Sequence, residues 1–173
     1  MNPAQPERTG TGGGLRYLTE EPAAGMVNQE LSHSCQVACA RQLLKDAGVD
    51  ISEADLLARI GYIEGIGTIA ASTAAVLSAL HPKLKYAGGE INEDLLQILF
   101  ARDPWIANLR TLHGSTHSVI VDRLDGDVVH VRDPWGIEGP TSEAGTVATI
   151  GLNEFMEHWH WAYYNGVIPV ARK

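Results

Sequence analysis

The chain has 173 residues, of which 45% are hydrophobic and 20% are charged, and its formal net charge is −8. This length and composition are typical of one globular domain and exclude a disordered chain, a collagen-like fibre and a disulfide scaffold. No stretch approaches the roughly 18 continuous apolar residues of a membrane-spanning helix, and the excess of acidic residues argues against nucleic acid as a partner.

The N-terminus carries no recognisable targeting signal. Residues 1–8 have neither the basic start nor the apolar run of a secretory signal, which predicts a cytoplasmic location and leaves signal-independent export open. Glycines occupy positions 12–14. We expect residues 1–24 to form a flexible N-terminal arm and residues 25–173 to form one folded domain.

The first half of the chain has the spacing of helices. Ser34 is a candidate N-cap for the first of them, Gly48 is its stop signal, and apolar residues such as Val37, Ala40 and Leu44 recur at helical spacing between the two. The predicted helices span 35–47, 52–60, an alanine-rich segment ending before 81, and 92–101, with a glycine-rich loop at 61–67.

The second half changes to the spacing of strands. Strands are predicted over 105–112, 117–124 and 128–133, followed by a loop over 134–147, a short helix over 153–159 and a final strand over 161–170. Helices first and strands second predict an α+β fold, with an N-terminal helical lobe and a C-terminal antiparallel β-sheet lobe.

The hairpin over 117–133 carries a histidine and an aspartate in phase with buried valines. His117 alternates with Val119 and Val121, and Asp133 alternates with Val131. A three-residue or bulged turn at 125–127 would pair Val121 with Val131 and Val119 with Asp133. His117 and Asp133 then become diagonal neighbours with Cβ atoms roughly 7 Å apart, so that the carboxylate can orient the imidazole.

Two cysteines, Cys35 and Cys39, have the spacing C-x-x-x-C, which is not that of a redox or zinc motif. We expect two free thiols with separate roles. Cys35, at the start of a helix, is the candidate nucleophile, because the helix N-terminus and a nearby imidazolium both favour a thiolate. Cys39, one turn further, is expected to pack in the core. Gln29 lies six residues upstream of Cys35 and is the candidate donor to an oxyanion.

Gln29, Cys35, His117 followed by Ser-Val-Ile-Val, and Asp133 followed by Pro-Trp-Gly together resemble the papain-like cysteine peptidases, in particular the bacteriocin-processing, or double-glycine, branch. The resemblance runs from about residue 26 to the C-terminus. It implies a papain-like fold with the active site between the two lobes, Cys35 as nucleophile, His117 as general base and then acid, Asp133 as the orienting residue and Gln29 as oxyanion donor. The sequence departs from this branch beside the nucleophile, where Ser34 and Gln36 replace the usual Asp and Gly.

These residues predict a cysteine peptidase that forms a thioester and needs no metal or organic cofactor. Trp135 is a candidate wall of the site and His33 a candidate rim. Two alternatives remain: a papain-like glutamine deamidase or transglutaminase-type effector toxin, and a peptide-binding module without catalysis. The expected partner is a peptide or protein substrate, with a cognate precursor peptide, a transporter or an inhibitor protein as further candidates.

Overall fold

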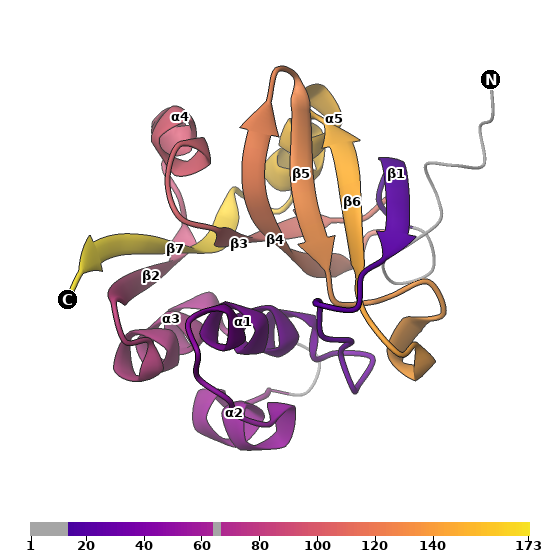
Figure 1. Ribbon diagram of the computed structural model, residues 1–173. Helices are drawn as coiled ribbons and strands as arrows, with labels where there is room; N and C mark the ends of the chain where they lie inside the picture. Colours follow the sequence, from indigo (N-terminus) through magenta and orange to yellow (C-terminus); the bar gives the residue numbers. More distant parts are fainter. Residues whose placement is uncertain (1–13, 64–66) are drawn as a thin grey trace.

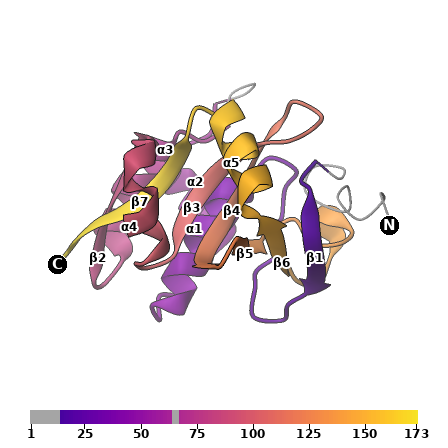
Figure 2. The same cartoon turned by 90° about the horizontal axis from the view of Figure 1, so that it is seen from above.

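A seven-stranded antiparallel sheet forms the centre of the computed structural model, which describes residues 14–63 and 67–173 (Figure 1). The strand order is β1-β6-β5-β4-β3-β7-β2, so that β1 and β2 form the two edges, as the view from above shows (Figure 2). The strands are β1 (Tyr17–Pro22), β2 (Leu84–Glu90), β3 (Trp105–Arg110), β4 (Thr116–Asp125), β5 (Val128–Asp133), β6 (Thr146–Gly151) and β7 (Asn165–Arg172).

Helices cover both faces of this sheet (Figure 1). The helices α1 (Cys35–Asp46), α2 (Glu53–Ile60) and α3 (Ala70–Leu80) lie on one face, and α5 (Leu152–Trp161) covers the other. The short helix α4 (Leu96–Phe100) follows a 3-10 turn, Glu93–Leu95, and a second such turn spans Gly139–Thr141. The α+β class is therefore confirmed.

Two hydrophobic cores result from this arrangement. On the face of α5, Val119, Val121 and Val131 pack with Phe155 and Trp159. On the opposite face, Ile106, Ile120 and Val167 pack against the residues of α1 to α3. Because the central strands are buried on both faces, their sequences are nearly continuous apolar runs rather than strict alternations.

The hairpin β4–β5 has the predicted register but achieves it differently. Val121 pairs with Val131 as expected, and Asp125 pairs with Val128, so that Gly126 and Asp127 form a two-residue turn. The prediction of a three-residue or bulged turn at 125–127 was therefore wrong about the position of the irregularity. The one unpaired residue lies inside β4 and not in the turn. A β-bulge between Val121 and Arg123 restores the parity that keeps His117 and Asp133 on one face.

An ion pair between Arg132 and Asp122 stabilises the bulge. Arg132 donates to both carboxylate oxygens of Asp122, the bulged residue, at 2.9 Å each, and a third N–H of Arg132 donates to Asp46 at the end of α1 at 2.8 Å. One guanidinium thus links the bulge of the sheet to the helix that begins at Cys35.

The boundary of the predicted arm needs correction. Residues 17–22, which were expected to belong to a flexible arm over 1–24, form β1 and pair with β6. The side chains of Leu15 and Tyr17 are buried in the core on the α5 face, which supplies the free energy that orders this segment. Residues 1–13 of the predicted arm lie outside the described residues.

Other differences concern elements that depend on distant partners. Strands β2 and β6 were not predicted, and the helix expected over 92–101 is reduced to a 3-10 turn and α4. Ser34 stands at the N-cap position of α1, but its side chain makes no capping bond and instead exchanges hydrogen bonds with the backbone of Leu31. Within the described part of the chain, the longest helices fall short of the length and hydrophobicity that crossing a membrane requires.

Candidate active site

The structure brings His117 and Asp133 into direct contact. His117 Nε2 lies 2.7 Å from Asp133 Oδ1, and both side chains are fully buried. Strand β4 supplies the histidine near its first residue and β5 supplies the aspartate at its last, so the hairpin pairing holds both groups. The rings of Trp135 and His117 make a T-shaped contact, with centroids 6.3 Å apart and planes at 87°, and the role of Trp135 as a wall of the site stays a prediction.

Two further donors reach the Asp133 carboxylate. The backbone N–H of Trp135 donates to Oδ1 at 2.8 Å, and the Tyr17 hydroxyl donates to Oδ2 at 2.7 Å. Burial would raise the pKa of Asp133, but the charge and hydrogen bond of His117, together with these two donors, hold it below its usual value. Asp133 is therefore ionised at neutral pH.

The imidazole of His117 also interacts with the thiol of Cys35. Nε2 is engaged by Asp133, and Nδ1 makes no hydrogen bond of ordinary geometry to any described residue. Burial lowers the pKa of His117, yet Asp133 and, to a smaller extent, Cys35 raise it to about 10. The ring is thus held as an imidazolium when the thiol next to it is ionised.

Cys35 is the first residue of α1 and is partly exposed. Burial raises the pKa of its thiol, whereas the hydrogen bond and charge of His117 and two interactions with Ser118 lower it, and the net pKa lies below the ordinary value. A thiolate paired with an imidazolium is the reactive form of a cysteine nucleophile. Cys35, His117 and Asp133 therefore form a linked series of three groups.

Cys39 has a different environment. It is fully buried in the core under α1, its thiol contacts the Ser118 carbonyl oxygen at 3.5 Å, and burial raises its pKa well above the ordinary value. A neutral, inaccessible thiol packs as a small apolar residue, which confirms the expected core role.

Gln29 is buried next to this series, but its side chain is already engaged. Its amide nitrogen donates to the Leu31 carbonyl at 2.7 Å, while Oε1 has no partner among the described residues. Its backbone N–H donates to Pro134 O at 2.7 Å and ties this segment to the residue after Asp133. The amide retains a second N–H, so its role toward an oxyanion stays a prediction.

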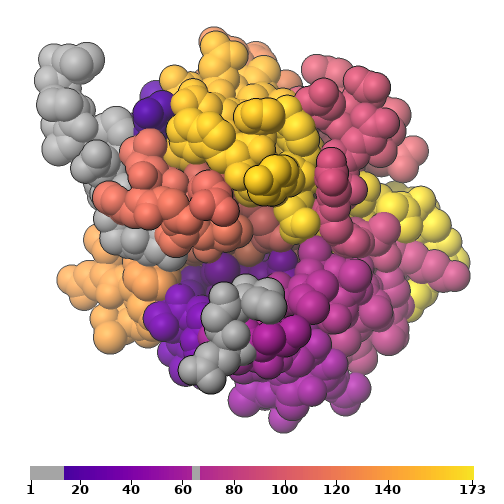
Figure 3. Space-filling view, turned by 180° about the vertical axis from the view of Figure 1, so that it is seen from behind, coloured from indigo at the N-terminus to yellow at the C-terminus, as the bar shows by residue number. Residues whose placement is uncertain are grey.

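A cleft of about 510 Å³ opens at Cys35, between the helices and the sheet. Figure 3 views the molecule from behind, where a hollow separates the indigo-to-magenta helical part from the salmon and yellow segments. His33, the expected rim residue, lines this cleft and packs on Tyr62 with ring centroids 4.2 Å apart, and the exposed Tyr163 lines the cleft as well.

Amide side chains occupy the inner part of this cleft. Asn108 donates to Gln36 Oε1 at 3.0 Å and to Asn165 Oδ1 at 2.6 Å, and it accepts from the Ser118 hydroxyl. Gln36 in turn donates to Thr73 at 2.6 Å. Gln36, which departs from the family pattern beside the nucleophile, therefore connects α1 to β3 through hydrogen bonds.

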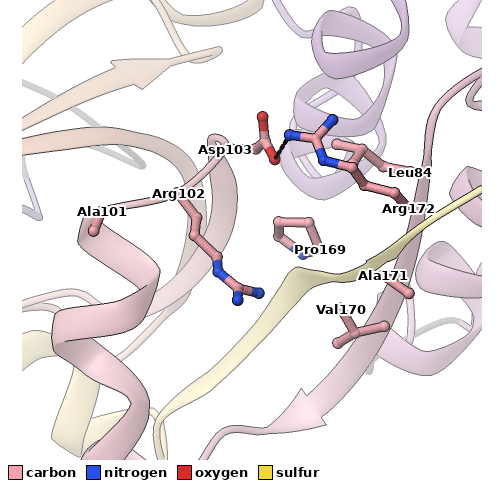
Figure 4. A pocket seen from close by; sticks show the side chains of 8 residues that line it. All are labelled: Leu84, Ala101, Arg102, Asp103, Pro169, Val170, Ala171 and Arg172. Atoms are coloured by element: carbon pink, nitrogen blue, oxygen red, sulfur yellow. Dashed lines mark ion pairs between the residues drawn. The ribbon is translucent and has the colours of Figure 1, made fainter.

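A second cavity, of about 580 Å³, lies between β2, β7 and the turn after α4 (Figure 4). Arg102 points into it, and Asp103 and Arg172 form an ion pair at 3.7 Å. It contains none of the three linked residues, so we assign it no catalytic role. Among residues 14–63 and 67–173 there is also no group of three histidine, cysteine or acidic side chains placed to hold a metal ion.

Tyr17 and Ser118 are the site residues that sequence reasoning missed. Tyr17 was assigned to the arm, and no local signal connects it to Asp133, 116 residues away. Ser118 could have been predicted, because it follows His117 directly. Alternation places it on the opposite face of β4, which α1 to α3 cover.

No protein-family model matches this chain, and no curated protein matches it. Solved structures do match. A Bacillus anthracis protein assigned as a C39-like peptidase has a TM-score of 0.62 at 16% identity, covering 90% of this chain and 99% of that chain. The peptidase domain of Streptococcus ComA, a bifunctional ABC transporter of a quorum-sensing pathway, has a TM-score of 0.61 at 18% identity, covering 83% and 96%.

A third structure is a double-glycine-motif protease from an AMS/PCAT transporter in complex with its leader peptide, with a TM-score of 0.57 at 14% identity, covering 90% and 93%. The neighbours include double-glycine peptidase domains, and they agree with the resemblance seen in the sequence. The chain has the fold of the C39-like, papain-like peptidases.

Proposed function

We propose that the chain is a cysteine peptidase that cleaves peptide bonds through a thioester. The observation that carries this proposal is the series Cys35–His117–Asp133, in which the carboxylate holds the imidazolium and the imidazolium lowers the pKa of a thiol at the edge of an open cleft. Each charge in the series is stabilised by the next one, as nucleophilic catalysis by cysteine requires.

In the proposed reaction, each of these side chains has a defined role in moving protons or electrons. The Cys35 proton moves to His117 Nδ1, and the thiolate attacks the carbonyl carbon of the scissile peptide. The Cys35 backbone N–H and the Gln29 amide donate to the oxyanion. His117 then protonates the leaving amine as the C–N bond breaks, which leaves a thioester on Cys35.

Water completes the cycle. His117 accepts a proton from the water molecule that attacks the thioester, and returns this proton to the departing sulfur. Asp133 keeps its charge throughout and holds Nε2–H in place, so that Nδ1 always faces the reacting atoms. No step in this sequence requires a metal or an organic cofactor.

The substrate of the proposed enzyme is a peptide lying in the cleft. This part of the proposal is supported by the neighbour that was solved with its leader peptide. The stacked rings of His33 and Tyr62 and the ring of Tyr163 line the same cleft and offer apolar surface to an extended chain. A precursor peptide is therefore the first substrate class to test.

The test is incubation of the purified chain with a peptide library, followed by mass spectrometry of the products. New N-termini that appear with the wild type and the Cys39→Ala variant, but not with Cys35→Ala, support the proposal. The mass gain of a deamidation without chain cleavage would instead assign the same residues to a glutamine deamidase. No Cys35-dependent product would favour the peptide-binding alternative.

A further inference from the structure

The Asp133 carboxylate is fixed by donors on both of its oxygens. Oδ1 accepts from His117 Nε2 and from the Trp135 backbone N–H, while Oδ2 accepts from the Tyr17 hydroxyl at 2.7 Å. With donors on one oxygen only, a carboxylate can still rotate about its Cβ–Cγ bond. The Tyr17 hydroxyl removes this freedom.

Tyr17 comes from a part of the sheet that the hairpin does not include. It is the first residue of β1 and is paired with Ile150 of β6, which lies between β1 and β5. Its side chain is 2% exposed and packs in the core on the α5 face. Burial, followed by the charge of Asp133, raises the pKa of Tyr17 well above its ordinary value, so the hydroxyl remains a neutral donor.

We propose that Tyr17 is a positioning residue of the active site, which holds the Asp133 carboxylate in the orientation that His117 needs. The inference rests on the proposed function of the Cys35–His117–Asp133 series. Without the hydroxyl, Oδ2 would be a buried anionic oxygen that has lost its one donor from the described residues, and the carboxylate would bind a proton more readily. The imidazolium would then lose its counter-charge at a higher pH than in the wild type.

A purely structural role for Tyr17 makes a different prediction. The ring contributes apolar area to the core, and phenylalanine would contribute nearly the same area. If only packing matters, Tyr17→Phe changes neither the reactivity nor the pH dependence of Cys35. The hydroxyl can therefore be separated from the ring by one substitution.

The experiment measures the rate at which iodoacetamide alkylates Cys35 in the intact chain, from about pH 4 to pH 9, with the modified residue identified by peptide mass. This rate reports the thiolate–imidazolium pair without needing a known substrate. The variants are Tyr17→Phe, Asp133→Asn and the double variant. Tyr86→Phe is the matched control, because Tyr86 is a buried tyrosine in the core on the other face of the sheet.

In the plot of alkylation rate against pH, we expect the acid limb of Tyr17→Phe to shift to higher pH by about one unit. At a given pH on that limb, alkylation should then be roughly tenfold slower than in the wild type. In the Asp133→Asn background the same substitution should change the rate less than about twofold, because both residues act through one carboxylate. Tyr86→Phe should follow the wild type.

Other outcomes overturn the inference in distinguishable ways. A wild-type profile like that of an ordinary thiol would overturn the proposed function, and the inference with it. A reactive wild type whose profile Tyr17→Phe leaves unchanged, or that Tyr86→Phe alters equally, would overturn the inference alone. Loss of the native near-ultraviolet circular dichroism in Tyr17→Phe would also overturn it, because the hydroxyl would then hold the fold rather than the carboxylate.

Discussion

His117 and Asp133 meet at 2.7 Å because a single extra residue, Asp122, sits in β4 between the histidine and the turn. Without this bulge, a two-residue turn would place the two side chains on opposite faces of the sheet. Since Arg132 binds the Asp122 carboxylate through two N–H groups, the bulge is a fixed feature of the hairpin. The contact between imidazole and carboxylate is therefore encoded by strand register.

The two cysteines should respond differently to substitution. Cys35→Ala removes the proposed nucleophile from the cleft, so turnover should be abolished while the free energy of unfolding stays near that of the wild type. Cys39→Ala removes a buried sulfur, which should cost about 1 kcal/mol of stability and leave turnover intact. Urea unfolding and turnover measured on the same samples would check both. Equal loss of turnover in the two variants would show that the thiols are wrongly assigned.

Asp133→Asn should lower the proposed activity by removing a charge, with little change of shape. The asparagine oxygen can still accept from His117 and Trp135, but the imidazolium loses its counter-charge. We expect turnover near pH 7 to fall by roughly tenfold or more. The alkaline limb of the pH profile should move down from about 10, the pKa of His117 in the folded chain. An unchanged alkaline limb would mean that Asp133 does not set this pKa.

The raised pKa of His117 also predicts a pH dependence of stability. Its pKa is about 10 in the folded chain against 6.5 as the ordinary value, so the stabilisation is fully present below pH 6.5 and is lost as the pH rises through 10. For Asp133 the pKa in the folded chain is lower than its ordinary value of 3.8. Its stabilisation is therefore present above pH 3.8 and is lost as the pH falls through the pKa of the folded chain. Denaturant titrations across this range should show the alkaline loss in the wild type and a smaller one in Asp133→Asn.

Gly145→Ala should disturb the site from the side of the sheet. A Cβ atom at this position would lie 2.5 Å from the Asp133 carbonyl oxygen and 2.6 Å from that of Val27, neither of which can easily move. We expect a loss of roughly 1–3 kcal/mol in the free energy of unfolding, together with slower alkylation of Cys35. Gly25→Ala is the matched control, because a Cβ there meets no atom within 4 Å. A Gly145→Ala chain as stable as this control would contradict the expectation.

The sequence was informative wherever the signal is local. The α1 helix begins at Cys35, the strands 105–110 and 128–133 lie where apolar residues cluster, and the valine pairing of Val121 with Val131 follows from alternation. Cys35, His117 and Asp133 could be predicted as candidate site residues. His117 and Asp133 share one hairpin, and Cys35 begins a helix. The relationship between His117 and Asp133 extends over one hairpin, whereas the link from Cys35 to this pair was predicted from the helix start and from the resemblance to the papain-like peptidases.

Only the tertiary structure decided the features that depend on distant partners. Strand β1 is ordered by its pairing with β6 and by the burial of Leu15 and Tyr17. The sequence of residues 1–24 alone predicts neither the pairing nor the burial. The position of the bulge depends on the pairing of two strands and on Arg132. The amide network of Gln36 and Asn108 joins a helix to a strand 72 residues away. Sequence periodicity determines which residues share a face, whereas contacts between separate elements decide which faces meet, because their free energy arises only when the whole sheet has formed.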